Sequence, residues 1–457
     1  MAADGSAPHD RPAEVSSDLP LPPGGKGLPL LGETLEFIRD TRHFVERRKE
    51  RYGKVFFSSI LGMRLVTLVG PEANRWIFSG ENKYLQNKWN YAVRKLLGAQ
   101  SLSMLNGEAH RARRRILAPH FKRTGLGPLV DPIAEVTREH LKRWANAGGE
   151  TVVVPRIKDL AFEIAARYIF GDISHLDLPR LSEVFDQWVK GLFVAVPLPL
   201  PGTTYGRAVK ARRELFAILG QELDRRARDP ERGPDVLSTL LEVRNDDGQP
   251  LPPSTIVDEI ALLMFAGHDT TVTSTSNILL HLAQHPAVLA KARAEQDALD
   301  GAPLTLEGLR SMAYLGQVIQ ESMRVIPPIG GSFRELTRDV EYGGFRLPKG
   351  WVVSVSPGAS HFDEEIWTDP EVFDPDRWSP ERAEHQRHPL AFIPFGGGAR
   401  VCLGRQFAML EMEIVLATML REYTWTLVPD QDLEFTFIPF PRPKNGMRVM
   451  FERRANG

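Results

Sequence analysis

The only cysteine of this 457-residue chain, Cys402, lies in a loop whose composition suggests a chemical role. The loop reads FIPFGGGARVCLGRQF over residues 392–407, with glycines on both sides of the cysteine. Glycines permit tight turns with positive φ and let a large flat group approach the backbone. Because a lone cysteine is more often a small buried core residue, the surroundings of the sulfur must decide between the two interpretations.

Two further features of the loop favour a bound metal. A helix is predicted over residues 403–422, and its first amides and positive dipole end would stabilise a thiolate at Cys402. Arg400, two residues before the cysteine, can meet an anion on the same face as the sulfur. A metal held by one thiolate, inside a cofactor with its own anionic groups, satisfies these observations, and haem iron with a proximal cysteine is that case.

A second candidate stretch lies inside a long predicted helix, residues 253–285. In its middle the apolar run ALLMFAG is followed by HDTTVTSTSN, which is rich in indifferent helix formers. Such a breach of propensity inside a core helix is often functional. The alternative is structural, because small hydroxyl side chains that bond their own i−4 carbonyl let another helix pack closely. The residues alone leave both interpretations open.

The rest of the chain predicts one mostly helical domain. One charged helix is expected over 34–52, followed by a strand hairpin that turns at Leu61–Gly62. Strand patterns return over 333–357, with YGGF as a turn, before an irregular stretch over 360–394. We therefore expect a mainly α fold with small β-sheets (α+β). Further helices are predicted near 71–79, 107–118, 131–147, 156–170, 178–193, 206–228, 286–299 and 311–326.

Composition excludes several classes of function. The net charge is −1, with 42% hydrophobic and 25% charged residues, which is typical of a folded globular protein that does not bind nucleic acid. One cysteine excludes an internal disulfide framework and fits a reducing, cytoplasmic compartment. No secretory signal or membrane-spanning run is found. We expect residues 1–20 to be a disordered tail and residues 21–457 to be the folded domain.

Here the residues resemble a known family. The pattern Phe395-x-x-Gly398-x-Arg400-x-Cys402-x-Gly404 resembles the haem-binding signature of the cytochrome P-450 superfamily, the haem-thiolate monooxygenases. The resemblance covers nearly the whole chain from about residue 21. Three more motifs are similar to those of the family: AGHDTT (Ala266–Thr271) to its oxygen-activation segment, Glu321-Ser322-Met323-Arg324 to its E-x-x-R helix, and Pro375-Asp376-Arg377-Trp378 to its meander arginine.

The resemblance implies haem b (iron protoporphyrin IX) as cofactor, with Cys402 as the iron ligand beneath a long central helix. On that helix, Thr270 and Asp269 would deliver protons for the activation of dioxygen, whereas His268 is given no role. Glu321, Arg324 and Arg377 would form a buried structural network; the alternative is an ordinary surface ion pair worth under about 1 kcal/mol. The residues implied to contact the haem or its propionates are His110, Arg114, Arg334, Phe395, Arg400 and Gly404.

The resemblance also implies an apolar pocket and hence a lipophilic substrate. The stretches LPPGGKGLPLLGET, GEAHRARRRILAPHF and LPKGWVV resemble the retinoid-hydroxylating branch, especially its soluble bacterial members. A retinoid, another terpenoid, a fatty acid or a polyketide all remain open. Residues 191–206 either pack as a structured loop or form a mobile apolar lid. The residues expected to line the pocket are Leu96, Leu97, Leu262, Phe265, Ala266, Ile329, Phe333, Phe437 and Ile438.

Electrons must come from a separate protein, because no flavin or iron–sulfur motif is present. A ferredoxin with its reductase, or a similar donor, is expected, and the chain itself is expected to be a monomer. A basic patch could dock an acidic donor, although a merely solvated helix face fits equally well. Its members are Arg111, Arg113, Arg115, Lys122 and Arg123.

Three functions remain at this point. The first is a monooxygenase that uses dioxygen and two electrons. The second is a haem-thiolate enzyme that uses peroxide or rearranges an oxygenated lipid, and the third is a non-catalytic haem or lipid binder. Neither of the last two needs proton delivery to dioxygen, so the Asp269–Thr270 pair favours the first.

Overall fold

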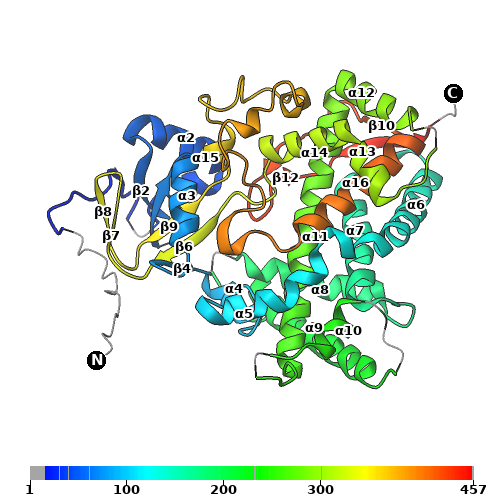
Figure 1. The fold of residues 1–457 in the computed structure, drawn as a ribbon, viewed down its shortest axis with the longest axis horizontal. Coiled ribbons are helices and arrows are strands. Elements are labelled where there is room, and N and C mark those ends of the chain that lie inside the picture. The colour runs from blue at the N-terminus through cyan, green and yellow to red at the C-terminus, as the bar shows by residue number, and fades with distance from the viewer. Residues whose placement is uncertain are drawn as a thin grey trace, which may run out of the picture.

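A 32-residue helix, α11 (Pro253–Gln284), runs through the middle of the molecule (Figure 1). At 1.5 Å per residue it is about 48 Å long. The structure is a computed structural model, and it describes residues 16–454 except positions 30, 40, 61, 195, 231, 232, 234, 246 and 300. Helices pack around α11, and most strands gather at the left of the view in Figure 1. This arrangement confirms the expected mainly α fold with small β-sheets.

The helices and strands have the following bounds. The other α-helices are α1 (Thr34–Arg39), α2 (Thr41–Tyr52), α3 (Pro71–Gly80), α4 (Tyr91–Leu96), α5 (Gly107–Leu117), α6 (Val130–Ala147), α7 (Val153–Phe170), α8 (Leu178–Leu192), α9 (Thr204–Ala227), α10 (Val236–Glu242), α12 (Pro286–Asp297), α13 (Leu306–Ser311), α14 (Ala313–Val325), α15 (Gly358–His361) and α16 (Arg405–Glu422). The strands are β1 (Gly24–Gly25), β2 (Val55–Ile60), β3 (Met63–Leu68), β4 (Leu85–Asn87), β5 (Glu150–Val152), β6 (Ser332–Leu336), β7 (Val340–Tyr342), β8 (Phe345–Leu347), β9 (Val352–Val355), β10 (Tyr423–Leu427), β11 (Phe435–Thr436), β12 (Arg442–Pro443) and β13 (Arg448–Arg453).

Two large hydrophobic clusters form the core, and α11 contributes to both. Its first half packs Ile260 and Phe265 into the cluster built with α8 and α9. Its second half packs Val272 and Leu279 into the cluster built with α6, α14 and α16. Leu263 packs against both clusters. The HDTT stretch of α11 therefore starts where the two halves of the core meet.

Six strands form the main sheet, in the order β1-β2-β3-β9-β6-β4. The predicted hairpin is β2 and β3, which pair antiparallel with Phe57 opposite Val66. Strand β9 pairs in parallel with β3, and β6 pairs antiparallel with both β9 and β4. The predicted YGGF turn joins β7 and β8. The β4–β6 pairing places Arg334 opposite Asn87, at the edge of the sheet that faces the helical part.

The prediction of one helix over 34–52 is wrong, because the structure has α1 and α2. A guanidinium nitrogen of Arg48 lies 2.5 Å from a carboxylate oxygen of Glu33 and 2.6 Å from one of Glu36. Twelve residues of straight helix would separate positions 36 and 48 by about 18 Å. These ion pairs therefore exclude one straight helix over 34–52. Helices α4 and α10 were not predicted, since six or seven residues carry too little periodicity.

Residues 1–15 of the predicted tail lie outside the described residues. The backbone N–H of Arg346 donates to the carbonyl oxygen of Pro20 at 2.9 Å. The chain is thus attached to the β7–β8 hairpin at the predicted start of the folded domain. Among the described residues, none of the helices combines the length and the apolar character needed to span a membrane.

Candidate active site around Cys402 and the central helix

Cys402 lies between a 3-10 turn (Gly398–Arg400) and the first residue of α16. Gly396 and Gly398 have φ values of 67° and 61°, in the left-handed region that favours glycine. A Cβ atom at Gly398 would also lie only 2.9 Å from the Cβ atom of Phe78. The N–H of Cys402 donates to the carbonyl oxygen of Phe395 at 2.8 Å, which closes the loop. Glycine is therefore required here for backbone conformation and for space.

Protein surrounds the Cys402 thiol closely enough to desolvate it, although the residue as a whole keeps exposed surface. Both observations hold if the sulfur faces an internal space. Burial raises the pKa of the Cys402 thiol and outweighs the backbone N–H groups of Gly404 and Arg405 and the charge of Arg114, which lower it. A thiolate at this position therefore needs one more positive charge close to the sulfur, as a bound metal ion supplies.

Residues in the middle of α11 also keep accessible surface. Ala266 is exposed and Thr270 is half-buried, although Phe265 and Asp269 beside them are buried. Leu263 on α11 and Leu403 next to Cys402 each pack against both core clusters. The cysteine loop and the centre of α11 therefore meet at the junction of the two clusters. The structure brings the predicted iron ligand and the predicted proton-delivery residues into one region.

Asp269 is buried, and three basic groups act on it. Its Oδ2 atom lies 3.5 Å from Nδ1 of His268, and its Oδ1 atom lies 3.4 Å from Nη1 of Arg442. Burial alone would raise the pKa of the Asp269 carboxyl, but His268, Lys158 and Arg442 outweigh it and hold that pKa below its ordinary value. Asp269 is therefore ionised near pH 7 and ready to accept a proton.

The Thr270 hydroxyl donates to the carbonyl oxygen of Ala266 at 2.8 Å. This is the i−4 bond of the structural interpretation. The two lone pairs of the hydroxyl oxygen still allow it to accept a hydrogen bond from a water or a substrate group. The geometry is therefore compatible with both interpretations, and the proton-delivery role of Thr270 and Asp269 stays a prediction.

Two predicted propionate-binding side chains, Arg334 and Arg400, pair with one carboxylate, Glu81, whose charge also acts on His110. The Nε atom of Arg334 donates to it at 2.7 Å, and the Nε atom of Arg400 donates at 2.5 Å. Burial, then the charges of Arg400 and Arg114, lower the pKa of His110 to about 4. The Nδ1 atom of His110 is buried and has no hydrogen-bond partner among the described residues. Two guanidinium groups thus share one carboxylate, and Arg114 adds a third positive charge near Arg400 and His110, so this region is short of negative charge.

Glu81 was missed by the sequence analysis. It follows α3 directly, in the stretch SGENKY, which carries no motif. Its ion pairs join residues 253 and 319 positions away along the chain. The pairing with Arg334 places Glu81 close to β4, the edge strand that also holds Asn87. Only the folded sheet reveals this contact, because no local spacing encodes it.

The Glu321 carboxylate is fully buried and accepts five hydrogen bonds. Arg324 donates two of them, both at 2.8 Å, and the Nε atom of Arg377 donates at 2.9 Å. The indole N–H of Trp378 donates at 2.9 Å and the backbone N–H of Asp374 at 3.0 Å. This geometry matches the predicted buried network and differs from a surface ion pair. Charge-assisted bonds of this kind are short and strong.

The network reaches the cysteine loop through His361, which sequence analysis did not single out. Arg324 donates to the carbonyl oxygen of His361 at 2.8 Å. The His361 ring lies 3.1 Å from the Arg324 carbonyl oxygen through Nδ1, and its Nε2 accepts the backbone N–H of Ile393 at 2.9 Å. Burial lowers the pKa of His361 to about 3, so its ring is neutral. Glu321 therefore helps to fix the backbone nine residues before the thiol.

The predicted pocket residues fall into two groups. Leu96, Leu97, Leu262 and Phe265 are buried together in the α8–α9 cluster, next to the exposed Ala266. The structure does not bring the remaining four into that cluster. Ile329 and Ile438 are exposed, Phe333 packs against the cluster of Phe44, and Phe437 is half-buried beside Phe435.

Phe440, which was not predicted, joins the cluster from the same segment as Phe437. Its ring centroid lies 5.8 Å from that of Phe193, and the Phe193 centroid lies 6.0 Å from that of Phe265. A chain of aromatic rings therefore connects the C-terminal segment to α11. The sequence places Phe437 and Phe440 three residues apart but does not reveal which of them points inward.

Comparisons with known proteins found a family model and several related chains. A family model described as Cytochrome P450 matches residues 22–451. The chain is 39% identical over 439 residues to a putative cytochrome P450 120 of Synechocystis, covering 96% of this chain and 98% of that protein. It is 32% identical to taxane 13-alpha-hydroxylase of Taxus cuspidata, with 96% and 93% covered. A solved structure of retinoic acid bound cyanobacterial CYP120A1 matches with a TM-score of 0.90 at 38% identity, covering 96% of this chain and all of that one.

Haem b, the cofactor of these relatives, fits the residues present. Its two propionates would supply the negative charge that Arg114, Arg334 and Arg400 need, and would give the buried Nδ1 atom of His110 an acceptor or a bridging water. Its iron would supply the positive charge that a thiolate at Cys402 needs. The role of each of these residues toward the haem is a prediction.

Removing the Glu321 carboxylate should destabilise the protein and loosen its hold on haem. We expect Glu321→Ala to lower the free energy of unfolding by about 3–5 kcal/mol, because, among the described residues, the buried Arg324 loses its only carboxylate partner and Arg377 keeps only Glu384. Urea unfolding followed by circular dichroism and by the Soret band measures both effects. Glu381→Ala, which removes an exposed carboxylate 60 positions along the chain, is the control and should behave as the parent. Equal midpoints for the two variants would contradict a structural role for Glu321.

Replacing Cys402 tests the iron ligand. The parent should show the strongly red-shifted Soret band of a thiolate-ligated ferrous carbonyl complex, and Cys402→His should lose that band while still binding haem. The chain has no second cysteine that could replace the ligand. A red-shifted band in the variant would therefore rule out the assignment. Cys402→Ser separates loss of the thiolate from the larger volume of histidine.

Proposed function

This chain belongs to the cytochrome P450 family and is a haem b monooxygenase, and from that premise we propose that it hydroxylates a lipophilic isoprenoid substrate with electrons from a separate protein. The observation that carries the substrate class is the match, at 38% identity, to a structure named for bound retinoic acid. A taxane hydroxylase among the relatives supports the same class, since taxanes and retinoids share isoprenoid skeletons. Fatty acids and polyketides are the other lipophilic candidates.

The apolar cluster supports this substrate class. Leu96, Leu97, Leu262 and Phe265 present only hydrocarbon near the exposed Ala266 of α11. Removing an isoprenoid chain from water against such side chains is favourable by about 25 cal/mol per Å² of apolar surface. A screen of isoprenoids, fatty acids and polyketides for a haem Soret shift tests the class. Tight shifts from fatty acids or polyketides alone would overturn the isoprenoid proposal.

Haem b, when bound, supplies the site where dioxygen binds and is reductively activated. The chain's own residues would govern the protons. Asp269 is ionised, and one of its oxygens lies toward Arg442, whose side chain is 21% exposed. A proton from solvent can therefore reach Asp269 on that side, and the adjacent Thr270 hydroxyl can pass it on through a water in the internal space. A positioned proton donor is worth about 10²–10⁴ in rate.

His268 would hold Asp269 in place. Its ring contacts those of Phe162 and Phe185 edge-on, with centroids 5.7 Å and 5.4 Å away. Its Nε2 atom lies 3.1 Å from the carbonyl oxygen of Lys158 on α7. A ring fixed on three sides keeps Nδ1 near Asp269. This contact was not foreseen, because the sequence analysis gave His268 no role.

Thr270→Ala should uncouple oxygen consumption from hydroxylation. We expect the variant to bind haem and substrate and to consume reductant, with more hydrogen peroxide and less product per electron pair. Thr271→Ala is a matched control, because Thr271 makes the same 2.8 Å bond to its i−4 carbonyl but is buried. Asp269→Asn should instead slow turnover by one to three orders of magnitude. If Thr270→Ala keeps the coupling of the control, the relay is wrong and a peroxide-using enzyme becomes the better proposal.

We propose a ferredoxin-like acidic electron donor that docks beside α5. On this helix Arg111 and Arg115 are exposed and share one face, where both pair with Glu108. Arg113 must be removed from the predicted patch, because it is 13% exposed and lies 2.5 Å from the buried Glu259. Two residues along a helix turn the side chain by about 200°, so position 113 faces inward when 111 and 115 face outward. Arg123 is also engaged, with Glu413 at 2.9 Å.

Charge reversal tests this docking face. Arg111→Glu with Arg115→Glu should slow reduction by a ferredoxin several-fold at low salt and weaken its dependence on salt. The control reverses Lys142 and Arg143, two exposed cations of α6. Stopped-flow reduction at several ionic strengths gives the measurement. If both double variants are reduced like the parent, α5 is only a solvated helix. A monomeric state and a cytoplasmic location stay predictions.

A further inference from the structure

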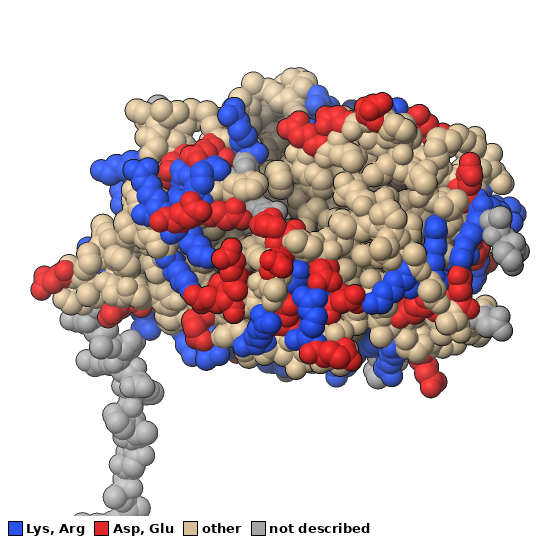
Figure 2. Space-filling model, turned by 90° about the horizontal axis from the view of Figure 1, so that it is seen from above, with Lys and Arg blue, Asp and Glu red and all other residues tan. Residues whose placement is uncertain are grey.

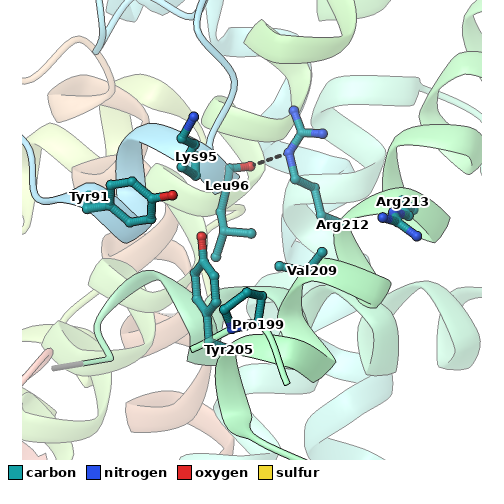
Figure 3. Close-up of a pocket in the computed structure, with 8 residues that line it drawn as sticks. All are labelled: Tyr91, Lys95, Leu96, Pro199, Tyr205, Val209, Arg212 and Arg213. Carbon is teal, nitrogen blue, oxygen red and sulfur yellow. Dashed lines mark hydrogen bonds between the residues drawn. The ribbon is translucent and has the colours of Figure 1, made fainter. Parts of the chain in front are cut away.

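A surface pocket of about 330 Å³ opens between α4, α9 and the connection that precedes α9 (Figure 3). Its lining includes none of the residues of the cysteine loop or of the middle of α11. Its lining combines apolar groups, two phenols and three cations, and it contains no acidic residue. The lining residues are Tyr91, Lys95, Leu96, Pro199, Tyr205, Val209, Arg212 and Arg213.

Lys95 and Arg213 have no ion-pair partner among the described residues, and Arg212 feels the charge of Asp258 without a direct ion pair. Arg212 is fixed in place, since its Nε donates to the carbonyl oxygen of Leu96 at 2.9 Å and its guanidinium stacks 3.9 Å from the Phe216 ring centroid. Its terminal nitrogens make no other hydrogen bond with described residues. Lys95 lies only over the ring of Tyr91, at 5.7 Å. Unpaired cations around a concave site attract an anion.

The two phenols add neutral hydrogen-bond donors. Burial, then the neighbouring Tyr91, raise the pKa of Tyr205, so its hydroxyl stays protonated. Figure 3 shows both hydroxyls directed into the space between α4 and α9. Arginine and tyrosine side chains together are well suited to a carboxylate, because a guanidinium binds it with paired N–H groups and a phenol adds a further donor.

The apolar part of the pocket leads toward the interior. Leu96 lines the pocket and also belongs to the buried cluster of Leu262 and Phe265. The connection around Pro199 exposes Val196, Leu198 and Leu200, with 66%, 51% and 57% of their surfaces accessible. The pocket therefore has a charged rim, an apolar floor and an apolar border. A ligand with a long hydrocarbon part and an anionic end matches all three.

We propose that this pocket is a surface binding site for a lipophilic carboxylic acid, with Arg212, Arg213 and Lys95 holding the carboxylate. The hydrocarbon would lie against Pro199 and Val209, over the buried Leu96 of the interior cluster. The pocket would recruit substrate, so this proposal rests on the proposed function. It narrows the proposed substrate class to carboxylic acids. A concave pocket of this size suits a small molecule better than the flat surface of a bilayer.

Binding of decanoate to the holoenzyme tests this site, with phenylimidazole present throughout to occupy the haem side. Isothermal titration calorimetry should show decanoate binding to the parent and much weaker binding of decanamide, its neutral analogue. Lys95→Gln with Arg213→Gln should raise the dissociation constant for decanoate about tenfold or more, since each charge-assisted bond lost is worth about that much. Decanamide should bind this variant as it binds the parent.

The control exchanges one exposed cation on each of the same two helices, Arg94→Gln on α4 and Lys210→Gln on α9, and neither lines the pocket. Its dissociation constant should equal that of the parent. Equal binding by all three proteins, or of decanamide and decanoate, would overturn the site. Binding of phosphatidylglycerol vesicles without binding of decanoate would also overturn the proposed site. No turnover is measured in this experiment, so failure of the surface site would leave the proposed hydroxylation intact. Conversely, an absence of hydroxylated product would leave the surface site intact.

Discussion

The buried Glu321 carboxylate is the interaction on which the geometry of the site depends. It joins α14 to the irregular segment 372–386 through Arg377 and Trp378. Through Arg324 and His361 it also fixes the backbone at Ile393, where the chain enters the cysteine loop. This loop has little regular structure of its own, since glycines allow its turns but do not select them. The rigid Glu321 network next to the loop holds it in one conformation, as regular backbone hydrogen bonds do in helices and strands.

A second constraint is the balance of charge in the site, which concerns the cysteine and the arginine cluster separately. Cys402 needs a nearby positive charge to be a thiolate, because burial raises its pKa. The cluster of Arg114, Arg334 and Arg400 needs negative charge beyond that of Glu81. Haem b would meet both requirements at once, with positive charge at its iron and negative charge at its propionates. Binding it should therefore also stabilise the folded chain, by the usual linkage between ligand affinity and stability.

Figure 2 shows acidic and basic residues interspersed over one outer face, without a large area of one sign of charge.

Sequence analysis predicted features that depend on short stretches of the chain. The long helix, the cysteine loop and the pairing of Glu321 with Arg324 each depend on a short pattern. Contacts between distant segments were missed, as Glu81, His361 and Phe440 show. Arg113 is a different case, because helix periodicity already places it opposite Arg111 and Arg115. Phe437 and Phe440 could not be told apart, since the short β11–β12 segment carries no periodicity that fixes the inward side.

The central claim is that one atom of dioxygen enters a lipophilic substrate at the space between α11 and the cysteine loop. The most direct measurement uses ¹⁸O₂ with the isoprenoid that gives the largest Soret shift, an electron donor and the purified protein. Mass spectrometry should find one ¹⁸O atom in each product molecule and the other in water. A product that carries oxygen only from water or from added peroxide, or two labelled atoms, would contradict the claim.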